Sequence, residues 1–480
     1  MEKLIFEKSA EGRRGYTLPE LEVPKVNGGL SNKFRRKTAS KLPQVSEIEV
    51  ARHFQGLSHL NFNIESGMYP LGSCTMKYNP KINEKIAGLP GFAGLHPLLS
   101  GEHTQGALRL LFELGECLKE ITGLAGVSLQ PVAGSQGELT GIYLFKAYHA
   151  SRGDKKRDTI LIPDSAHGTN PSSAAIAGMK IESVKSNEHG KIDLADLKSK
   201  LGDHIAGFMV TNPSTVGIFE SEIIEVQKAV SDCGGLMYMD GANLNALLSI
   251  VRPGDMNFDC MHINLHKTFS TPHGGGGPGA GPICVSERLI PFLPSPTVEK
   301  DGDEFRLEYN NPDSIGRVHA FFGNFGVLVR AYTYIRMLGA KGLRAVSENA
   351  VINANYLLAR LKNDFDVPFK EHCMHEFILS GNRQKKIGVS TRDMAKRLLD
   401  YGFHAPTVYF PLVVPEAMLI EPTETENKQN LDGFADALIA IAREVENDPD
   451  KVLSAPHSSP VKRLDEAGAN RNLNIRYDFS

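Results

Sequence analysis

Polar side chains able to do chemistry stand at the ends of four short apolar runs in the middle of this sequence. Apolar runs separated by helical stretches are typical of buried parallel strands, whose carboxyl ends meet at one edge of a sheet. We therefore expect a ligand site at that edge. In chain order the side chains are His167 after residues 160–163, Thr211 and Asn212 at and after the end of 206–211, Asp240 at the end of 236–240, and Lys267 after 261–265.

A lysine and a carboxylate at neighbouring strand ends suit pyridoxal phosphate (PLP). The amine of Lys267 can form a Schiff base with the PLP aldehyde, and Asp240 can keep the pyridine nitrogen protonated so that the ring accepts electrons. His167 can stack on the ring, and Thr211 and Asn212 can reach its hydroxyl group or the substrate. Each residue alone has a simpler explanation, such as a helix cap for Asp240. The prediction therefore rests on their convergence.

A glycine-rich turn at residues 133–138 is expected to hold the phosphate of this cofactor. Gly134 permits close approach of the backbone, and Ser135 offers a hydroxyl group. The helix predicted at residues 137–150 would direct the positive end of its dipole at the phosphate. A turn of this kind is common, so its position ahead of the strand–helix units is what makes it informative.

The order of the predicted elements indicates an α/β fold. Strands alternate with amphipathic helices from residue 104 onward, which is typical of a mostly parallel sheet with helices on both faces. A long helical stretch at 325–361, with a break at Gly339–Gly342, leads to a smaller α+β region. The predicted domains are an N-terminal arm (1–100) with one helix at 45–56, a large PLP-binding α/β domain (101–335), a small C-terminal α+β domain (336–450) and a C-terminal tail (451–480).

Composition excludes several classes of protein. The chain has 480 residues, 53 of them Lys or Arg and 56 Asp or Glu, so its formal net charge is −3 and no basic excess favours nucleic acid or an anionic membrane. Six dispersed cysteines without a CxxC pair argue against a disulfide framework and a metal site. The first 20 residues lack the apolar stretch of a secretory signal. We expect a cytoplasmic protein with no membrane span.

Longer motifs carry a family resemblance. The chain resembles fold-type I PLP-dependent transferases of the aspartate-aminotransferase type, and more closely the glycine-cleavage P-protein, the decarboxylating glycine dehydrogenase. Its length is similar to that of the separate second subunit of this family. The matching stretches are 12–24, 68–80 (MYPLGSCTMKYNP), 133–141, 164–174, 211–220, 238–246, 264–282, 314–336 and 460–467.

The resemblance implies an activity, partners and roles for residues. The activity is decarboxylation of glycine, with transfer of the aminomethyl group to the lipoyl arm of H-protein, and the partner is a first P-protein subunit in a dimer of heterodimers. Lys267 would carry PLP covalently and act in catalysis with His167, while Asp240 would pair with the pyridine nitrogen. The full set of expected cofactor contacts is Lys267, Asp240, Ala242, His167, Gly134, Ser135, Gln136, Thr211, Asn212 and His266.

Two alternatives remain open at this stage. Another fold-type I PLP enzyme, such as an amino-acid decarboxylase or a cysteine desulfurase, would share the Lys, Asp and His set, although a desulfurase also needs a catalytic cysteine, for which Cys373 is a weak candidate. A non-catalytic subunit of the same complex would have no use for Lys267 and Asp240. Candidates for contact with the substrate carboxylate are Arg317, His319 and the segment 73–77.

Overall fold

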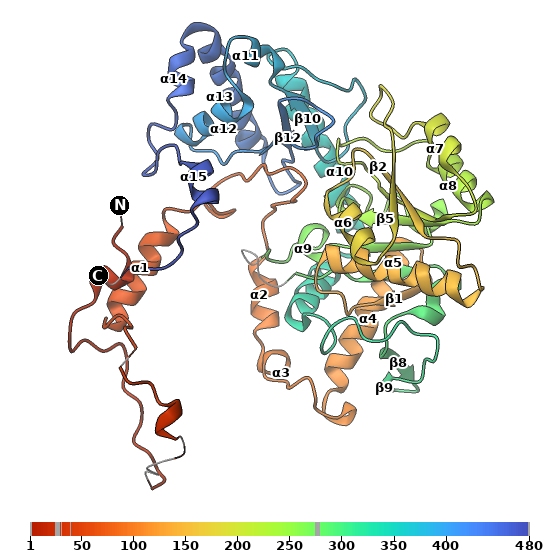
Figure 1. The fold of residues 1–480 in the computed structure, drawn as a ribbon, viewed down its shortest axis with the longest axis horizontal. Coiled ribbons are helices and arrows are strands. Elements are labelled where there is room, and N and C mark those ends of the chain that lie inside the picture. Colours follow the sequence, from red (N-terminus) through yellow and green to blue (C-terminus); the bar gives the residue numbers. More distant parts are fainter. Residues whose placement is uncertain (1, 25–28, 30, 39, 274–278, 479–480) are drawn as a thin grey trace. The chain divides into compact units, whose positions relative to one another are not determined.

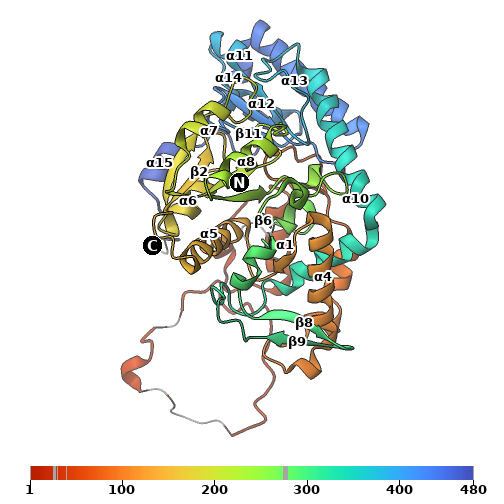
Figure 2. The same ribbon diagram turned by 90° about the vertical axis from the view of Figure 1, so that its right-hand side faces the viewer.

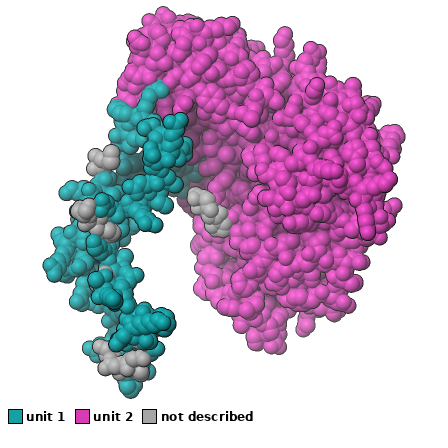
Figure 3. All heavy atoms as spheres, viewed as in Figure 1, with its two compact units in different colours: residues 1–67, 458–480 teal, residues 68–457 magenta. Residues whose placement is uncertain are grey.

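The computed structural model describes residues 2–24, 29, 31–38, 40–273 and 279–478. Residues 274–278, inside the matching stretch 264–282, lie outside the described part. The chain forms two compact units, residues 1–67 with 458–480 and residues 68–457 (Figure 3). Among the described residues, no helix combines the length and apolar character that crossing a membrane requires.

The smaller unit joins the two ends of the chain. Its longest helix, α1 (Glu47–Ser58), confirms the helix predicted at 45–56 and begins with a capping box between Ser46 and Glu49. The rings of Phe6 and Tyr477 stack with centroids 4.6 Å apart. The other helices of this unit are η1 (Ile5–Lys8), η2 (Asn32–Phe34) and α15 (Glu466–Arg471).

A seven-stranded sheet forms the centre of the larger unit (Figure 1). Its strand order is β1-β7-β6-β5-β4-β2-β3, and β7 runs antiparallel to both of its neighbours while the remaining pairs are parallel. The mostly parallel sheet predicted from the apolar runs is thus confirmed. The strands are β1 (Gly126–Ser128), β2 (Thr159–Pro163), β3 (Lys180–Val184), β4 (Ile205–Thr211), β5 (Leu236–Gly241), β6 (Cys260–Ile263) and β7 (Ile283–Val285).

Helices cover both faces of this sheet (Figures 1 and 2). Strand β5 shows why: Met237 and Met239 pack in one hydrophobic core and Leu236 and Tyr238 in another, since successive side chains point to opposite faces. The flanking helices are α4 (Gln105–Thr122), α7 (Leu194–Lys200), α8 (Ile223–Asp232) and α10 (Phe325–Leu361) on the first face, and α5 (Gly134–Ser151) and α6 (Thr169–Ile176) on the second.

Helix α10 links this layer to the smaller α+β region. Gly339 interrupts the helix with φ 59° and ψ −175°, inside the break predicted at Gly339–Gly342. Residues before and just after the break belong to the core under the large sheet, whereas Ala354, Leu357 and Leu361 belong to a separate core. The predicted domain boundary at 335/336 therefore falls within α10.

The α+β region has a three-stranded antiparallel sheet of order β10-β12-β11. Its elements are β10 (Phe377–Ser380), α11 (Asn382–Lys386), α12 (Thr391–Asp400), β11 (Thr407–Val408), β12 (Ala417–Ile420), α13 (Lys428–Asn447) and α14 (Pro449–Leu453). The remaining elements of the larger unit are α2 (Lys81–Ala87), α3 (Pro90–Ala93), η3 (Gly101–His103), η4 (Leu244–Ala246), η5 (Pro253–Met256), α9 (Leu265–Thr268), η6 (Glu287–Phe292) and the hairpin β8 (Thr297–Asp301) and β9 (Glu304–Glu308).

Candidate active site

Adjacent strands bring the predicted residues to one edge of the large sheet. In the parallel register, Thr211 of β4 pairs with Asp240 of β5, and Asp240 pairs with His262 of β6. Lys267 lies on the short helix α9, which begins two residues after β6 ends. The carboxylate and the lysine therefore stand at the carboxyl ends of neighbouring strands, where open α/β sheets bind ligands.

Asp240 is a buried carboxylate with three polar neighbours. Asn170 donates to it at 3.0 Å and the backbone N–H of Ala242 at 2.9 Å, while Nε2 of His262 lies 3.3 Å away. Burial alone would raise the pKa of Asp240, but His262, Asn170, Ala242 and Lys267 outweigh burial and hold this pKa below its usual 3.8. At neutral pH the site thus contains a fixed negative charge.

Lys267 points its amine at a backbone carbonyl from a distant part of the chain. Its Nζ donates to the oxygen of Ser73 at 2.8 Å, and the side chain is half-buried. The next carbonyl, that of Cys74, lies 2.9 Å from Nε2 of His273. The segment 73–77, a candidate from the sequence for substrate contact, therefore does lie beside the lysine.

His167 keeps an exposed ring next to these charges. Its Nδ1 lies 2.9 Å from the hydroxyl of Thr169, which donates to Glu138 at 2.7 Å. Partial removal of water around the ring and the charge of Lys267 lower the pKa of His167, so the ring is neutral at neutral pH. A neutral, oriented imidazole with an exposed face is suited to stacking on a flat cofactor.

Polar contacts lead from Asp240 through His262 to Asn264, which packs against the start of α5. The hydroxyl of Tyr238 lies 2.6 Å from Nδ1 of His262, whose Nε2 lies 2.9 Å from the side-chain oxygen of Asn264. The amide of Asn264 lies so close to Gly134 that a Cβ there would approach it to 2.4 Å. Only glycine fits at this position, and its absence of a side chain brings the first turn of α5 against the strand ends.

The residues predicted to hold phosphate divide into two groups. Gly134 and Ser135 begin the 18-residue helix α5, whose N-cap Ala133 makes no side-chain capping bond, so the first N–H groups of the helix are available to a ligand. The side chain of Gln136, in contrast, is occupied: it accepts from the N–H of Val132 and donates to the carbonyl of Val318, both at 2.8 Å. Only the backbone of Gln136 remains for a phosphate.

His266 cannot supply the positive charge that a phosphate would favour. Burial, together with His273 and Lys267, lowers the pKa of His266 to about 3. The ring of His266 meets the ring of His273 edge-on, with centroids 5.3 Å apart. His266 can therefore contribute a neutral N–H or shape to the site, and no charge.

Two further predicted residues have buried polar atoms without a partner in the described structure. These atoms are the hydroxyl of Thr211 and the side-chain nitrogen of Asn212, whereas the oxygen of Asn212 accepts from Glu220. Ala242 follows Asp240 directly and is half-buried. Unpartnered polar atoms at the strand ends are what a site for a polar ligand requires.

Two candidates for substrate contact lie in different environments. The amine of Lys77 is buried and committed to Glu424 at 2.7 Å and to the carbonyl of Thr268 at 2.9 Å. Arg317 is exposed and lies over the ring of Phe322, 5.9 Å from its centroid.

The sequence missed several residues that shape the site, chiefly His262, Asn170 and the acids Glu376 and Glu421. His262 lies inside the apolar run 261–265 and is therefore expected only as part of a strand. Asn264, two residues later, is also polar. Glu376 and Glu421 lie more than 100 residues after Lys267, next to β10 and β12. A polar residue directly before the end of β6 was the available signal.

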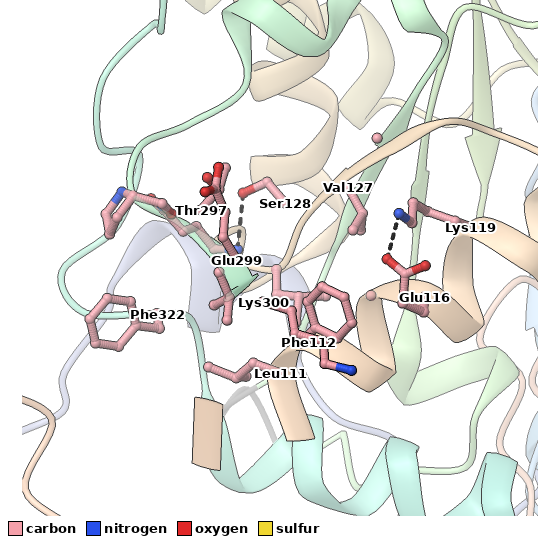
Figure 4. A pocket seen from close by; sticks show the side chains of 16 residues that line it. Leu111, Phe112, Glu116, Lys119, Val127, Ser128, Thr297, Glu299, Lys300 and Phe322 are labelled. Atoms are coloured by element: carbon pink, nitrogen blue, oxygen red, sulfur yellow. Dashed lines mark hydrogen bonds and ion pairs between the residues drawn. The ribbon is translucent and has the colours of Figure 1, made fainter. Parts of the chain in front are cut away.

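A separate cavity of about 370 Å³ lies between α4, β1 and the β8–β9 hairpin (Figure 4). Its wall includes the ion pair of Lys119 with Glu116 at 2.5 Å. Gln130 in the same wall accepts from the N–H of Val318, whose carbonyl binds Gln136. The lining of this cavity contains none of the strand-end residues, but Val318 links it to the start of α5.

Comparisons with known proteins identify the family. A family model described as "Glycine dehydrogenase, C-terminal domain" matches residues 346–462. A protein of Chloroherpeton thalassium named "Probable glycine dehydrogenase (decarboxylating) subunit 2" is 60% identical over 482 residues, covering 99% of this chain and 98% of that protein. A protein of the same name from Listeria innocua is 56% identical over 476 residues, with 99% and 98% covered.

The chain belongs to the glycine dehydrogenase (decarboxylating) subunit 2 family. The resemblance inferred from the sequence motifs is thereby confirmed, and members of this family are enzyme subunits.

Solved structures show the fold of this glycine dehydrogenase family member. A crystal structure of the glycine decarboxylase (P-protein) of the glycine cleavage system superposes with a TM-score of 0.73 at 18% identity, covering 86% of this chain and 93% of that one. A cysteine desulfurase from Thermococcus onnurineus superposes with a TM-score of 0.61 at 16% identity, covering 80% and 98%. The predicted fold-type I architecture, a mostly parallel sheet with a smaller C-terminal α+β region, is confirmed.

Proposed function

We propose that this chain is the PLP-bearing subunit of a glycine decarboxylase. It would remove carbon dioxide from glycine and pass the aminomethyl group to the lipoyl arm of H-protein. The single observation that carries the proposal is the placement of Lys267 and Asp240 at neighbouring strand ends, beside a neutral His167, in a chain of this family.

The residues present fit PLP. The amine of Lys267 is the group that would bind the aldehyde, and the ionised Asp240 is the group that would pair with the ring nitrogen. The first turn of α5, with Gly134 and Ser135, would hold the phosphate. When bound, PLP supplies an electron-accepting ring for the pair of electrons released as the bond to the carboxylate breaks.

The side chains around Lys267 would control protons and orientation. Asp240 keeps its negative charge because Asn170 and the Ala242 N–H donate to it, so the pairing with a ring nitrogen persists at neutral pH. His167 presents a neutral face and adds no charge that would compete with this pairing. Lys267 would hold a proton on Nζ while the amine rests against the Ser73 carbonyl.

A cysteine desulfurase is the rival enzyme that the fold allows, and the cysteine chemistry argues against it. Cys74 adjoins the lysine site, but burial raises the pKa of its thiol to about 11. Burial likewise raises the pKa of Cys373, the desulfurase candidate from the sequence, to about 12. A catalytic thiol needs its thiolate form near neutral pH, which both environments oppose.

We further propose that the chain works with a first P-protein subunit, which the words "subunit 2" in the names of its relatives support. The proposed assembly is a dimer of heterodimers. A reducing compartment such as a cytoplasm suits its six cysteines, all of which are unpaired. A pull-down of the tagged chain from lysate with the first subunit co-expressed would test the pairing.

The test of the proposed function is an absorption spectrum of the chain with its partner subunit, with and without glycine, beside Lys267→Ala. We expect a visible band that the variant lacks and that glycine shifts, followed by carbon dioxide release that depends on lipoylated H-protein. A colourless wild type that takes up no PLP would overturn the proposal in favour of a non-catalytic subunit. A coloured protein whose spectrum glycine does not change would favour another fold-type I PLP enzyme with a different substrate.

A further inference from the structure

The segment of residues 71–77, which we call the strap, crosses beside Lys267 in a conformation that its sequence disfavours. Ser73 and Thr75 have φ values of 64° and 51°, in the left-handed region that residues other than glycine seldom adopt. Such conformations persist only where the surrounding structure holds them. The strap therefore needs specific partners.

Two buried carboxylates provide these partners. Glu376 accepts from the N–H of Ser73 at 2.7 Å, and Glu421 accepts from the N–H and the hydroxyl of Thr75 at 2.8 and 2.6 Å. Neither carboxylate has any exposed surface. We call Glu376 and Glu421 the buried acid pair.

The sheet of the α+β region places the two acids side by side. Glu376 comes directly before β10 and Glu421 directly after β12, and the antiparallel register pairs Phe377 with Ile420. The strap is fixed to the same sheet, since Leu71 forms a bridge with Ile420 and the carbonyl of Gly72 accepts from Thr407. A Cβ on Gly72 would lie 2.4 Å from Leu419, so the strap packs against β12 as closely as backbone can.

The result of this arrangement is a pair of carbonyl groups aimed at the candidate site. With the N–H groups of Ser73 and Thr75 turned toward the acids, the carbonyl of Ser73 meets Nζ of Lys267 at 2.8 Å and that of Cys74 meets His273 at 2.9 Å. Burial raises the pKa of both acids, and the hydrogen bonds from Ser73 and Thr75 oppose this rise. The acids and the strap therefore stabilise each other.

We propose that Glu376 and Glu421 are positioning residues for Lys267: through the strap they hold the Ser73 carbonyl where it receives the lysine ammonium whenever the lysine is not bound to cofactor. This inference rests on the proposed function for its catalytic meaning, because only a lysine that is released and recaptured needs a fixed resting place.

The exchange of lysine for glycine shows why the resting place matters. When glycine takes the place of Lys267 on a bound cofactor, the bond from the cofactor to the Lys267 nitrogen would break as the bond to the glycine nitrogen forms. Lys267 would then leave as an ammonium, carrying the two hydrogens that the glycine ammonium gives up. This ammonium sits on a flexible four-carbon chain. An oriented carbonyl keeps it within reach and gives its charge an acceptor.

Charge around the acid pair supports this role and disfavours a metal ion. His375, Glu376 and Glu421 each offer an atom within 4.8 Å of the others, and both ring nitrogens of His375 are buried without a partner. The charge of Lys267, however, acts on all three groups, and three of the four oxygens of the acid pair already accept from the strap. An added cation would be repelled by the lysine.

The matched variants follow from the geometry of the two acids. Glu421 accepts strap donors with both oxygens, so Glu421→Gln places an N–H₂ against one donor. Thr75→Ala removes only the hydroxyl contact, and Thr75→Ser restores it, so this pair tests the strap contact without changing either acid. Glu376 accepts a strap donor with one oxygen, so Glu376→Gln can keep that contact.

The experiment measures how fast an acylating reagent labels Lys267 in the cofactor-free chain at about pH 8, by mass spectrometry, with exposed Lys156 as internal standard. We expect Glu421→Gln to raise Lys267 labelling by about three- to tenfold, with Thr75→Ala between this variant and wild type and Thr75→Ser and Glu376→Gln near wild type. The measurement needs neither PLP nor glycine, so its failure is distinct from failure of the proposed function.

Two results would overturn the proposal. Unchanged Lys267 labelling in both Glu421→Gln and Thr75→Ala would show that the strap does not hold the lysine. About one equivalent of metal in the wild type, lost in Glu421→Gln, would make the cluster a metal site. If Glu421→Gln does not fold, increased labelling of a half-buried lysine outside the strap, such as Lys200 on α7, reveals it, and the Thr75→Ala result then tests the proposal.

Discussion

Lys267 donates from its side-chain amine to the backbone carbonyl of Ser73, 2.8 Å away and 194 residues earlier in the chain. This contact joins the carboxyl end of the large sheet to the strap that the smaller sheet holds. The candidate site is thus made by both layers of the larger unit. The predictions below test separate parts of this arrangement.

Replacing the buried carboxylate should abolish activity with little loss of fold. Asp240→Asn keeps the size and the Asn170 neighbour but removes the charge that would pair with a ring nitrogen. We expect glycine decarboxylation to fall by about 100-fold or more, the scale of losing a fixed charge that stabilises a transition state. Carbon dioxide release is the measurement.

Asp259→Asn is the matched control for this prediction. Asp259 is equally buried, accepts from the N–H of Met237 at 2.8 Å and pairs with Arg288 away from the strand-end site. The Asp259→Asn variant should lower the unfolding midpoint and leave the activity per folded molecule unchanged. Equal loss of activity in both variants would show that burial of charge, and not the site, explains the effect.

Filling the space at the start of α5 should weaken cofactor binding. A Cβ on Gly134 would meet the side chain of Asn264 at 2.4 Å, so Gly134→Ala must displace either the helix start or the asparagine. We expect PLP affinity to fall by about tenfold or more, measured by titration of the visible absorbance. Gly106→Ala, in α4 with no atom within 4 Å of the added Cβ, should bind PLP normally and gain about 0.5–1 kcal/mol of stability.

Removing the hydroxyl of Tyr238 should cost stability and loosen Asp240. The hydroxyl lies 2.6 Å from Nδ1 of His262, and both side chains are buried, so Tyr238→Phe leaves one imidazole nitrogen without a partner. The expected loss is about 1–3 kcal/mol in the free energy of unfolding, read from denaturant titration.

Tyr334→Phe provides the comparison, because its hydroxyl makes only long contacts of 3.4 Å with Lys77 and Glu424. Its loss should be smaller than that of Tyr238→Phe. A Tyr238→Phe variant as stable as wild type would mean that His262 finds another partner.

The stability of the smaller α+β region should depend on pH through Glu444. Hydrogen bonds from Arg397, assisted by Lys451 and Tyr401, lower the pKa of Glu444 from 4.5 to about 2. A carboxylate with a lowered pKa stabilises the fold fully above its unfolded-state pKa, and this contribution disappears as the pH falls from about 4.5 through 2. We therefore expect this contribution to stability to be lost only as the pH falls.

Glu444→Gln should be less stable than wild type at pH 6, and the difference should shrink toward zero by about pH 2. The measurement is the urea midpoint as a function of pH, with exposed Glu446→Gln on the same helix as control. A difference that is independent of pH would contradict the ion-pair origin of the stabilisation.

The sequence predicted the large sheet well because its strands are buried on both faces. Strands β2, β4 and β5 are continuous apolar runs, each followed or ended by a polar residue, and this pattern led directly to His167, Thr211 and Asp240. Strand β3, with its first two residues exposed, lacks that pattern and was not predicted. The residue roles at the site remain predictions.

What the sequence could not predict depends on contacts between distant segments. Glu376 and Glu421 contact strap residues that lie 303 and 346 positions earlier in the chain. No local sequence pattern indicates that an acid will be buried. The side-chain direction of Gln136, toward Val318, was equally hidden because it depends on where a segment 182 residues later comes to lie. Periodicity reports burial of apolar groups and not the partners of polar ones.

The long span of the strap contacts also orders events during synthesis of the chain. The ribosome makes the strap, the sheet edge and Lys267 well before it makes Glu376 and Glu421, so the strained residues Ser73 and Thr75 have nothing to hold them until the end of β12 has emerged. A nascent chain truncated before residue 421 can form much of the large sheet, yet it cannot finish the pocket around its lysine. Completion of the site is therefore a late event in folding, coupled to the addition of β12, the last strand among the described residues.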